Sequence, residues 1–217
     1  MLIWQLIDSG FPSGGFAHSG GLEASVHHGL VTDAAGVAAF ARQALAQAGR
    51  SALPLMTAAY DDPDGLRELD RLADLFLNNP VANRASRIQG RALLTSVGRS
   101  FPTAAVLGLE GRVKNAQLCC HYAPMFGAAL RTLDIGRAEA GRALLFTTVR
   151  NVTSSAVRLG LLGAYEAQEV QALLASAIEL TLERCSSLTP ADIAQTAPLV
   201  DLCQSTHDRL YSRLFQS

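Results

Sequence analysis

The sequence LRELDRLADLF at residues 66–76 decides the fold class. Its apolar residues recur at the three-and-four spacing of one α-helical face, at Leu66, Leu69, Leu72, Leu75 and Phe76. The charged residues between them fall mostly off that face, as in an amphipathic helix. Turn residues bound the segment on both sides, with Pro and Gly at 61–65 and Asn-Asn-Pro at 78–80. The stretch therefore predicts a surface helix between two turns.

The same spacing recurs along most of the chain, and no stretch alternates as a β-strand would. Further helices are expected at 2–8, 21–28, about sixteen residues from Thr32 or Asp33, 53–60, 81–97, 119–130, 137–158 and 166–185. Their expected inner faces include Ile88 and Leu173. Residues 98–117 carry several Gly and a Pro and are expected to be broken. One short turn is expected between Pro190 and Pro198.

Neither repeats nor shifts in composition divide the chain. The fold class predicted is therefore all-α. Residues 1–217 are expected to form one domain of roughly eight to ten packed helices, in which residues 199–217 are a short C-terminal docking tail.

The amino-acid composition and the net charge limit the classes of function that this chain can have. Hydrophobic residues make up 49% of the 217 residues and charged residues only 17%, against about 25% in typical soluble domains. Either an obligate partner or an Ala-rich helical core explains this balance. The net charge of -1 lacks the excess of positive charge that is typical of a nucleic-acid-binding protein. No apolar stretch reaches transmembrane length, no secretory signal is recognisable, and four Cys fit free thiols, so a cytoplasmic protein is expected.

The run at residues 5–23 combines five glycines with two Phe and a lone His. We expect Phe11 and Phe16 to anchor an irregular elbow to the core and Ser19 to cap the next helix, with Glu23 in its first turn. The run lacks the Gly-Lys-Ser/Thr of a phosphate loop and the Gly-x-Ser-x-Gly of a hydrolase elbow. No catalytic residue is therefore assigned. His18 is either a structural histidine or a group that faces a metal path.

Metal-ligand types cluster at two places, His27-His28 and Cys119-Cys120-His121. Neighbours on a helix point about 100° apart, and neither cluster has the spacing of a structural zinc site. Core packing or surface placement is thus the simpler interpretation, and no tight metal site is predicted. His121, Cys119 and Cys120 remain weak candidates, because a symmetric dimer could double each ligand.

The C-terminal residues differ from a loose polar end. Tyr211, Leu214 and Phe215 interleave with Arg209 and Arg213, and Tyr and Arg are the residue types that anchor protein interfaces. A docking segment is favoured over packing within the chain. The stripe Arg84, Arg87 and Arg91, by contrast, fits a solvated helix face.

Four segments together resemble the UreF-type urease accessory proteins. The first carries a long signature, made of Asp8, Ser9, Phe11, Pro12, Gly14, Phe16, His18, Ser19, Gly21, Leu22 and Glu23. The others are 121–127, the small-residue stretch 155–160 with Arg158 and Gly160, and the end of the chain at 198–201 and 207–217. The resemblance thus spans nearly the whole chain.

The resemblance implies a homodimeric all-α protein without catalysis of its own. Members of the family bridge a UreD/UreH-type scaffold and the UreG GTPase so that nickel enters urease apoprotein. The implied docking residues for UreD/UreH are Arg209, Leu210, Tyr211, Arg213, Leu214, Phe215 and Ser217. No cofactor is expected to be bound tightly, and nickel is handled by the complex. Two alternatives stay open: direct regulation of GTP hydrolysis, and nickel carriage across a dimer axis.

Overall fold

Helices form where the apolar spacing recurs, and no strand occurs in residues 2–217, the part of the chain that the computed structural model describes. The helices are α1 (Leu2–Leu6), α2 (Leu22–His27), α3 (Ala34–Arg50), α4 (Ala52–Asp61), α5 (Leu66–Phe76), α6 (Pro80–Ser100), α7 (Ala104–Ala116), α8 (Tyr122–Thr132), α9 (Arg137–Arg158), α10 (Ala164–Cys185) and α11 (Pro198–Thr206). Single 3₁₀ turns lie at Gly15–Ala17, Pro63–Gly65, Pro190–Asp192 and His207–Arg209. The all-α prediction is confirmed.

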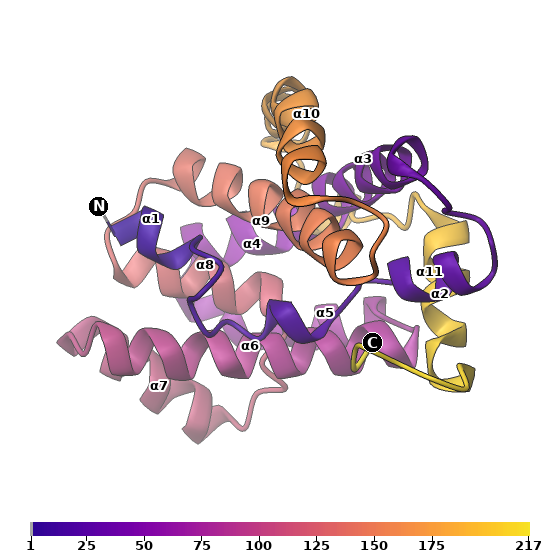
Figure 1. Cartoon of the computed structure of the whole chain (residues 1–217). Coiled ribbons are helices and arrows are strands. Elements are labelled where there is room, and N and C mark those ends of the chain that lie inside the picture. The colour runs from indigo at the N-terminus through magenta and orange to yellow at the C-terminus, as the bar shows by residue number, and fades with distance from the viewer. Residues whose placement is uncertain (1) are drawn as a thin grey trace.

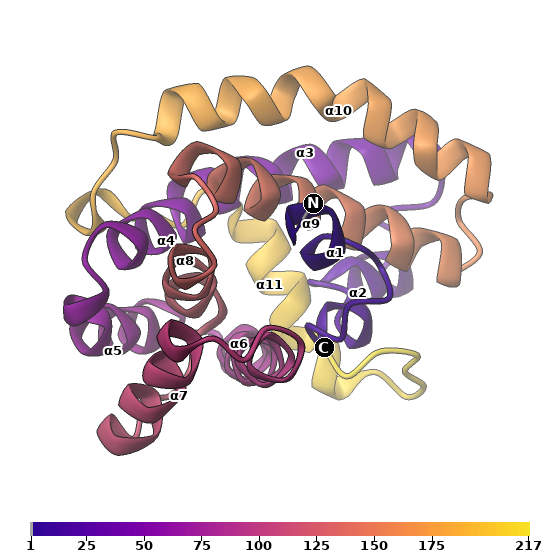
Figure 2. The same ribbon diagram turned by 90° about the vertical axis from the view of Figure 1, so that its left-hand side faces the viewer.

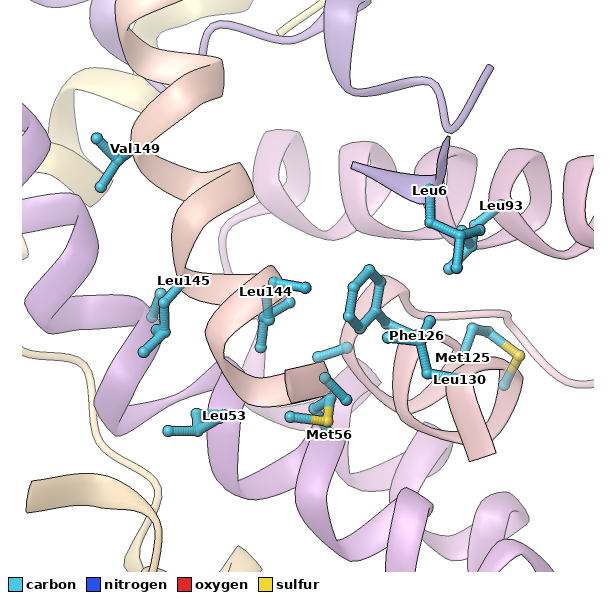
Figure 3. Close-up of a cluster of buried hydrophobic side chains, with 14 of the residues drawn as sticks. Leu6, Leu53, Met56, Leu93, Met125, Phe126, Leu130, Leu144, Leu145 and Val149 are labelled. Atoms are coloured by element: carbon cyan, nitrogen blue, oxygen red, sulfur yellow. The ribbon is translucent and has the colours of Figure 1, made fainter. Parts of the chain in front are cut away.

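The core is built around α8, against which α4, α5, α6, α7 and α9 pack (Figures 1 and 2). Every residue from Ala123 to Leu130 is buried, as expected of a helix that is apolar on all sides. Helices α4 and α6 pack on α8, and α9 packs on α3 and α10. Figure 3 shows Phe126 and Leu130 meeting Met56 of α4 and Leu144 of α9. These contacts form one continuous core.

Close backbone contact between α4 and α8 depends on Gly127. A Cβ atom at this position would lie 2.0 Å from the carbonyl oxygen of Met56. Only glycine therefore permits this approach of α8 to α4.

Two sequence expectations about element bounds are wrong. Residues 98–117 are broken only at 101–103, around Pro102, since α6 runs on to Ser100 and α7 occupies Ala104–Ala116. Gly108 and Gly111 lie within α7 with nothing near their missing side chains, so tertiary contacts outweigh their low helix propensity. The tail is likewise shorter than expected, because Pro198 opens α11 instead of ending a turn, and α11 packs on α2 and α6.

Three residues expected on inner faces are instead exposed: Leu75, Ile88 and Leu173. Their spacing matches the apolar stripe of each helix, but no neighbouring element covers those edges in the described chain. Asp33, by contrast, begins α3 as expected, since its side chain accepts the Gly36 N–H at 2.8 Å. No helix among residues 2–217 has the length and apolar character needed to cross a membrane.

Candidate functional site

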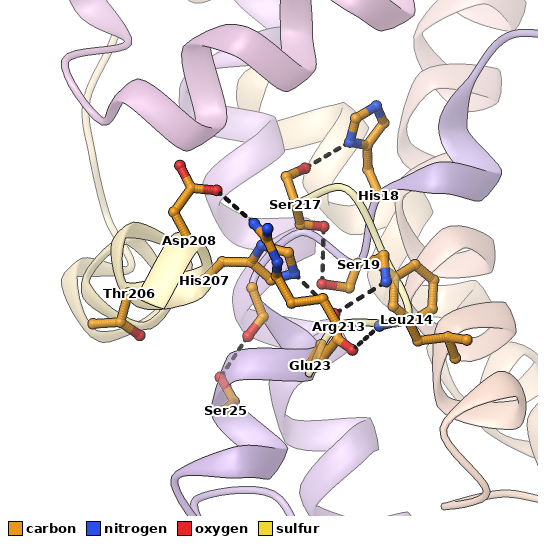
Figure 4. A network of polar contacts seen from close by, with 12 residues as sticks. His18, Ser19, Glu23, Ser25, Thr206, His207, Asp208, Arg213, Leu214 and Ser217 are labelled. Carbon is orange, nitrogen blue, oxygen red and sulfur yellow. Dashed lines mark hydrogen bonds and ion pairs between the residues drawn. The ribbon is translucent and has the colours of Figure 1, made fainter. Parts of the chain in front are cut away.

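The fold brings the N-terminal glycine-rich segment against the end of the chain. We call this contact the terminal junction; it comprises residues 14–23 and 207–217 (Figure 4). Glu23 of α2 is its centre and is nearly fully buried. Its carboxylate accepts the backbone N–H groups of Leu214 and Phe215 and pairs with Nε2 of His207 at 2.8 Å. Because a carboxylate only accepts, Nε2 of His207 carries the proton.

Ser217 provides the second set of contacts. Its carbonyl oxygen accepts from the backbone N–H of Ser19 at 2.6 Å and from the Ser19 hydroxyl at 3.1 Å. Its hydroxyl lies 2.6 Å from Nδ1 of His18. The Gln216 N–H adds a bond to the Ala17 carbonyl at 2.8 Å. The two ends of the chain are thus paired through backbone groups as well as side chains.

Arg158, at the end of α9, joins the junction to the body of the protein. Its guanidinium lies over the ring of Phe16 at 3.8 Å and over the ring of Phe215 at 4.2 Å, a double cation–π contact. It also donates to the Phe16 carbonyl. Phe16 is 66% exposed, so its expected role as a core anchor is wrong. It instead covers Arg158 at the surface, whereas Phe11 is buried and faces Phe101 as expected.

Glycines set the path of the N-terminal segment. Gly14 and Gly21 have positive φ values of 79° and 93°, and a Cβ on Gly21 would lie 3.1 Å from the Gln204 side chain of α11. Gly21 also directly precedes α2, and no side chain caps that helix. Ser19 therefore does not cap α2 as expected, because its hydroxyl is committed to Ser217.

The other signature residues have supporting positions. The side chain of Asp8 accepts the Gly10 N–H at 2.7 Å, and the Pro12 carbonyl accepts from Ser96 of α6 at 2.8 Å. Leu22 is fully buried. Ser9 lines a surface depression that Arg158 also borders, and Gly160 adopts a positive φ of 74° just after α9.

His18 is held neutral by its surroundings. Burial, and after it the charges of Arg84 and His207, together lower its pKa to about 4. Its Nε2 atom has no hydrogen-bond partner, nor has Nδ1 of His207. Protonation of His18 at neutral pH would thus place a charge in a site that cannot solvate it.

The outer side of the tail presents a different set of residues. Tyr211 is fully exposed, and Arg209, Arg213 and Leu214 are exposed beside it. Asp208 pairs with Arg84 of α6 at 2.8 Å and with Arg213 at 3.2 Å, which ties the tail to the helical body. The remaining predicted docking residues, Leu210, Phe215 and Ser217, face inward.

A second cluster forms at the start of α8. The buried carboxylate of Asp70 accepts the backbone N–H groups of Cys119, Cys120 and His121, at 2.6, 3.3 and 2.7 Å. Nε2 of His121 lies 3.0 Å from Oδ1 of Asp74. The cysteine of this segment that lies near His121 is Cys119, while Cys120 is buried among hydrophobic residues.

His27 and His28 stay at the surface and do not join that cluster. Their rings contact each other edge to face at 5.6 Å, and Nε2 of His28 lies 2.9 Å from the Thr206 hydroxyl. The sequence pattern did not predict a site role for Asp70 or Asp74. Asp70 carries a signal that could have found it, since it shares the buried face of α5 with Leu66 and Ala73.

The chain is similar to known proteins over nearly its whole length. A model of the UreF family matches residues 31–175. Urease accessory protein F of Arabidopsis thaliana is 34% identical over 99% of this chain and 91% of its own length. Urease accessory protein UreF of Paenarthrobacter aurescens is 32% identical over all of this chain and 97% of its own. That of Trichodesmium erythraeum is 28% identical, over 99% and 95%. These relatives are named as accessory proteins.

Proposed function

This chain belongs to the UreF family of urease accessory proteins, and from that premise we propose that it acts as a non-catalytic adaptor. Family membership supports a role in urease maturation. The specific proposal is that the chain bridges a UreD/UreH-type scaffold and a UreG-type GTPase, so that nickel enters urease apoprotein. Nickel passes as cargo of the complex, without a tightly bound cofactor in this chain.

The two-sided tail is the observation that supports this proposal best. Its inner side is fixed by Glu23, Ser19 and Arg158. Its outer side offers Tyr211 between two arginines, with Leu214 directly after the second. Tyr and Arg are typical of interface anchors, and a segment already ordered on its own protein loses less entropy on binding. The tail is therefore suited to dock the UreD/UreH-type partner.

The adaptor role also needs a second surface. We propose that this chain forms a homodimer in the cytoplasm and that the surface of this dimer binds the GTPase, as the family resemblance implies. The exposed apolar residues of α10, among them Tyr165, Leu173 and Leu180, offer a candidate face for that dimer.

Co-purification with the UreD/UreH-type partner tests the docking role. Deletion of residues 209–217 is expected to abolish capture, but it also removes the buried Leu210 and Phe215. The sharper variant is Tyr211→Ala, which leaves every inward contact in place and is expected to weaken capture at least tenfold, or about 1.4 kcal/mol. Trp4→Ala on α1 is the control, since that aromatic side chain is also exposed and lies outside the tail and the proposed dimer face. Equal capture by Tyr211→Ala, Trp4→Ala and the wild type would refute the docking role.

The GTPase assay separates the adaptor from the alternative of a direct regulator. GTP turnover by the UreG-type protein is measured with and without this chain. A rate that stays unchanged while the complex forms supports the adaptor and removes direct regulation.

A further inference from the structure

We propose that Asp74, Cys119 and His121 form a binding site for one divalent transition-metal ion of the nickel and zinc class within a single protomer. The proposal deepens the adaptor role, and it rests on that role only for the identity of the ion. Weak sequence candidates were Cys119, Cys120 and His121 across a dimer axis. The structure instead joins two of them to an aspartate of α5.

The distances between the ligand atoms fit this class of ion. Sγ of Cys119, a ring nitrogen of His121 and a carboxylate oxygen of Asp74 all lie within 4.8 Å of one another. Metal bonds of about 2.0–2.3 Å place the ligands of a tetrahedral ion roughly 3.3–3.8 Å apart. The His121–Asp74 separation of 3.0 Å is already that short. A side-chain shift of about an ångström at Cys119 closes the rest.

The backbone holds two of the ligands in place before any ion arrives. The Asp70 carboxylate accepts hydrogen bonds from the three backbone N–H groups of residues 119–121. Cys120 has a positive φ of 68°, a left-handed conformation that is unfavourable for a non-glycine residue. This turn sends Cys120 into the core, while Cys119 and His121 meet at Asp74. A strained residue between two converging side chains is a feature of functional sites.

The second nitrogen of His121 also has a suitable partner. Nδ1 lies 3.2 Å from the Ser86 hydroxyl of α6, and that hydroxyl accepts the Tyr122 N–H at 3.0 Å. When Nε2 binds an ion, the imidazole proton moves to Nδ1, and the second lone pair of the Ser86 oxygen accepts it. Ser86 therefore orients the ring in both states.

Charge and access suit an ion that exchanges. The side chain of Asn83 donates to Oδ1 of Asp74 at 3.0 Å, which holds the carboxylate beside His121. The Asp74 side chain is 40% exposed, which opens the site to solvent. Three protein ligands leave a fourth position for water or a ligand from a partner.

Ligand type selects the class of ion. Thiolate and imidazole favour nickel, zinc and copper ions, whereas magnesium and calcium prefer sites made only of oxygen ligands. A carboxylate and a thiolate together neutralise a divalent charge. The chemistry of the site thus matches the ion that the adaptor's complex is proposed to handle.

Equilibrium dialysis of the purified full-length chain against Ni²⁺, Zn²⁺ and Co²⁺ tests the site. The expected result is one ion per protomer, with a thiolate-to-metal charge-transfer band for Ni²⁺ and Co²⁺. Cys119→Ser is expected to abolish the band, and Asp74→Asn to weaken affinity at least about tenfold. Cys120→Ser is the matched control and should bind as the wild type does. Circular dichroism and thermal melting verify that each variant is folded.

The outcomes decide this inference separately from the adaptor role. No binding by the wild type, an unchanged band in folded Cys119→Ser, or equal loss in folded Cys119→Ser and Cys120→Ser would overturn the site. Cys119→Ser is also tested for co-purification with the UreD/UreH-type partner, which binds through the tail. Normal capture with no metal binding by the wild type removes only the metal site, whereas metal binding without capture removes only the adaptor.

Discussion

A few side chains hold the end of the chain on the body of the protein. The carboxylate of Glu23 satisfies two backbone N–H groups and one imidazole that lie 184–192 residues away in sequence. A buried carboxylate is tolerable only when such donors surround it, so loss of the tail would leave Glu23 with a large desolvation penalty. Arg158 also depends on the tail, because its guanidinium lies over the ring of Phe215 as well as over that of Phe16. Tail and junction therefore stabilise each other.

Acid is expected to weaken the junction through His18. The folded-state pKa of His18 is about 4, against an ordinary value of 6.5. The unfolded chain therefore takes up a proton below pH 6.5 that the folded chain refuses until about pH 4. The stabilising effect of neutral His18 is complete above pH 6.5 and is lost as the pH falls from 6.5 to 4. Urea unfolding of the wild type and of His18→Asn, measured every half unit across this range, checks the difference between them.

The variant should lose less stability on acidification than the wild type does. Carboxylates titrate in both proteins and cancel in the comparison. His27→Asn is the control, because His27 is exposed and its loss should leave the wild-type slope intact. Parallel curves for the wild type and His18→Asn would show that His18 does not titrate in the way that its burial requires.

Helix positions could be predicted from sequence because each helix carries its own apolar period. The segment 66–76 is an example, since α5 spans the same residues. What covers each face could not be predicted, because that depends on elements remote in sequence. Leu75 and Leu173 fit their stripes and yet face outward. The glycines of α7 led to a wrong prediction of a broken segment, because their low helix propensity contributes less than the tertiary contacts that keep α7 helical.

The glycines of α6 and α7 permit a direct test of this distinction. A Cβ at Gly90 of α6 would lie 1.9 Å from the Cys120 carbonyl oxygen, so Gly90→Ala must displace the segment that leads into α8. We expect a loss of about 1–3 kcal/mol in the free energy of unfolding. Gly108→Ala on α7 meets nothing within 4 Å and should gain up to about 1 kcal/mol. Chemical denaturation measures both, and a stable Gly90→Ala protein would disprove the close contact.

At the scale of the whole molecule, segment 14–23 and the C-terminal segment 207–217 close on each other. Of the candidate site, the sequence predicted the residue types at each end, for instance Glu23 and Tyr211. It could not predict their pairing, because hydrogen bonds between segments 191 residues apart leave no periodic signal. The same limit applies to Asp74, which becomes a neighbour of His121 only when α5 packs on α8.

The outer face of α10 carries two exposed leucines among its polar residues, and a dimer interface would bury them. Leu173 and Leu180 lie one heptad apart on the same side, and Leu173 is 61% exposed. Burial of such residues in a twofold interface would also account for the low charged fraction of 17%. Leu173→Glu is expected to convert a dimer into a monomer without loss of helicity, since that side chain is largely exposed in the protomer. Sedimentation equilibrium gives the mass, and Gln168→Glu, exposed on another side of α10, adds the same charge as a control. A dimer that survives Leu173→Glu unchanged would place the interface elsewhere, and the charged fraction would then reflect only the Ala-rich core.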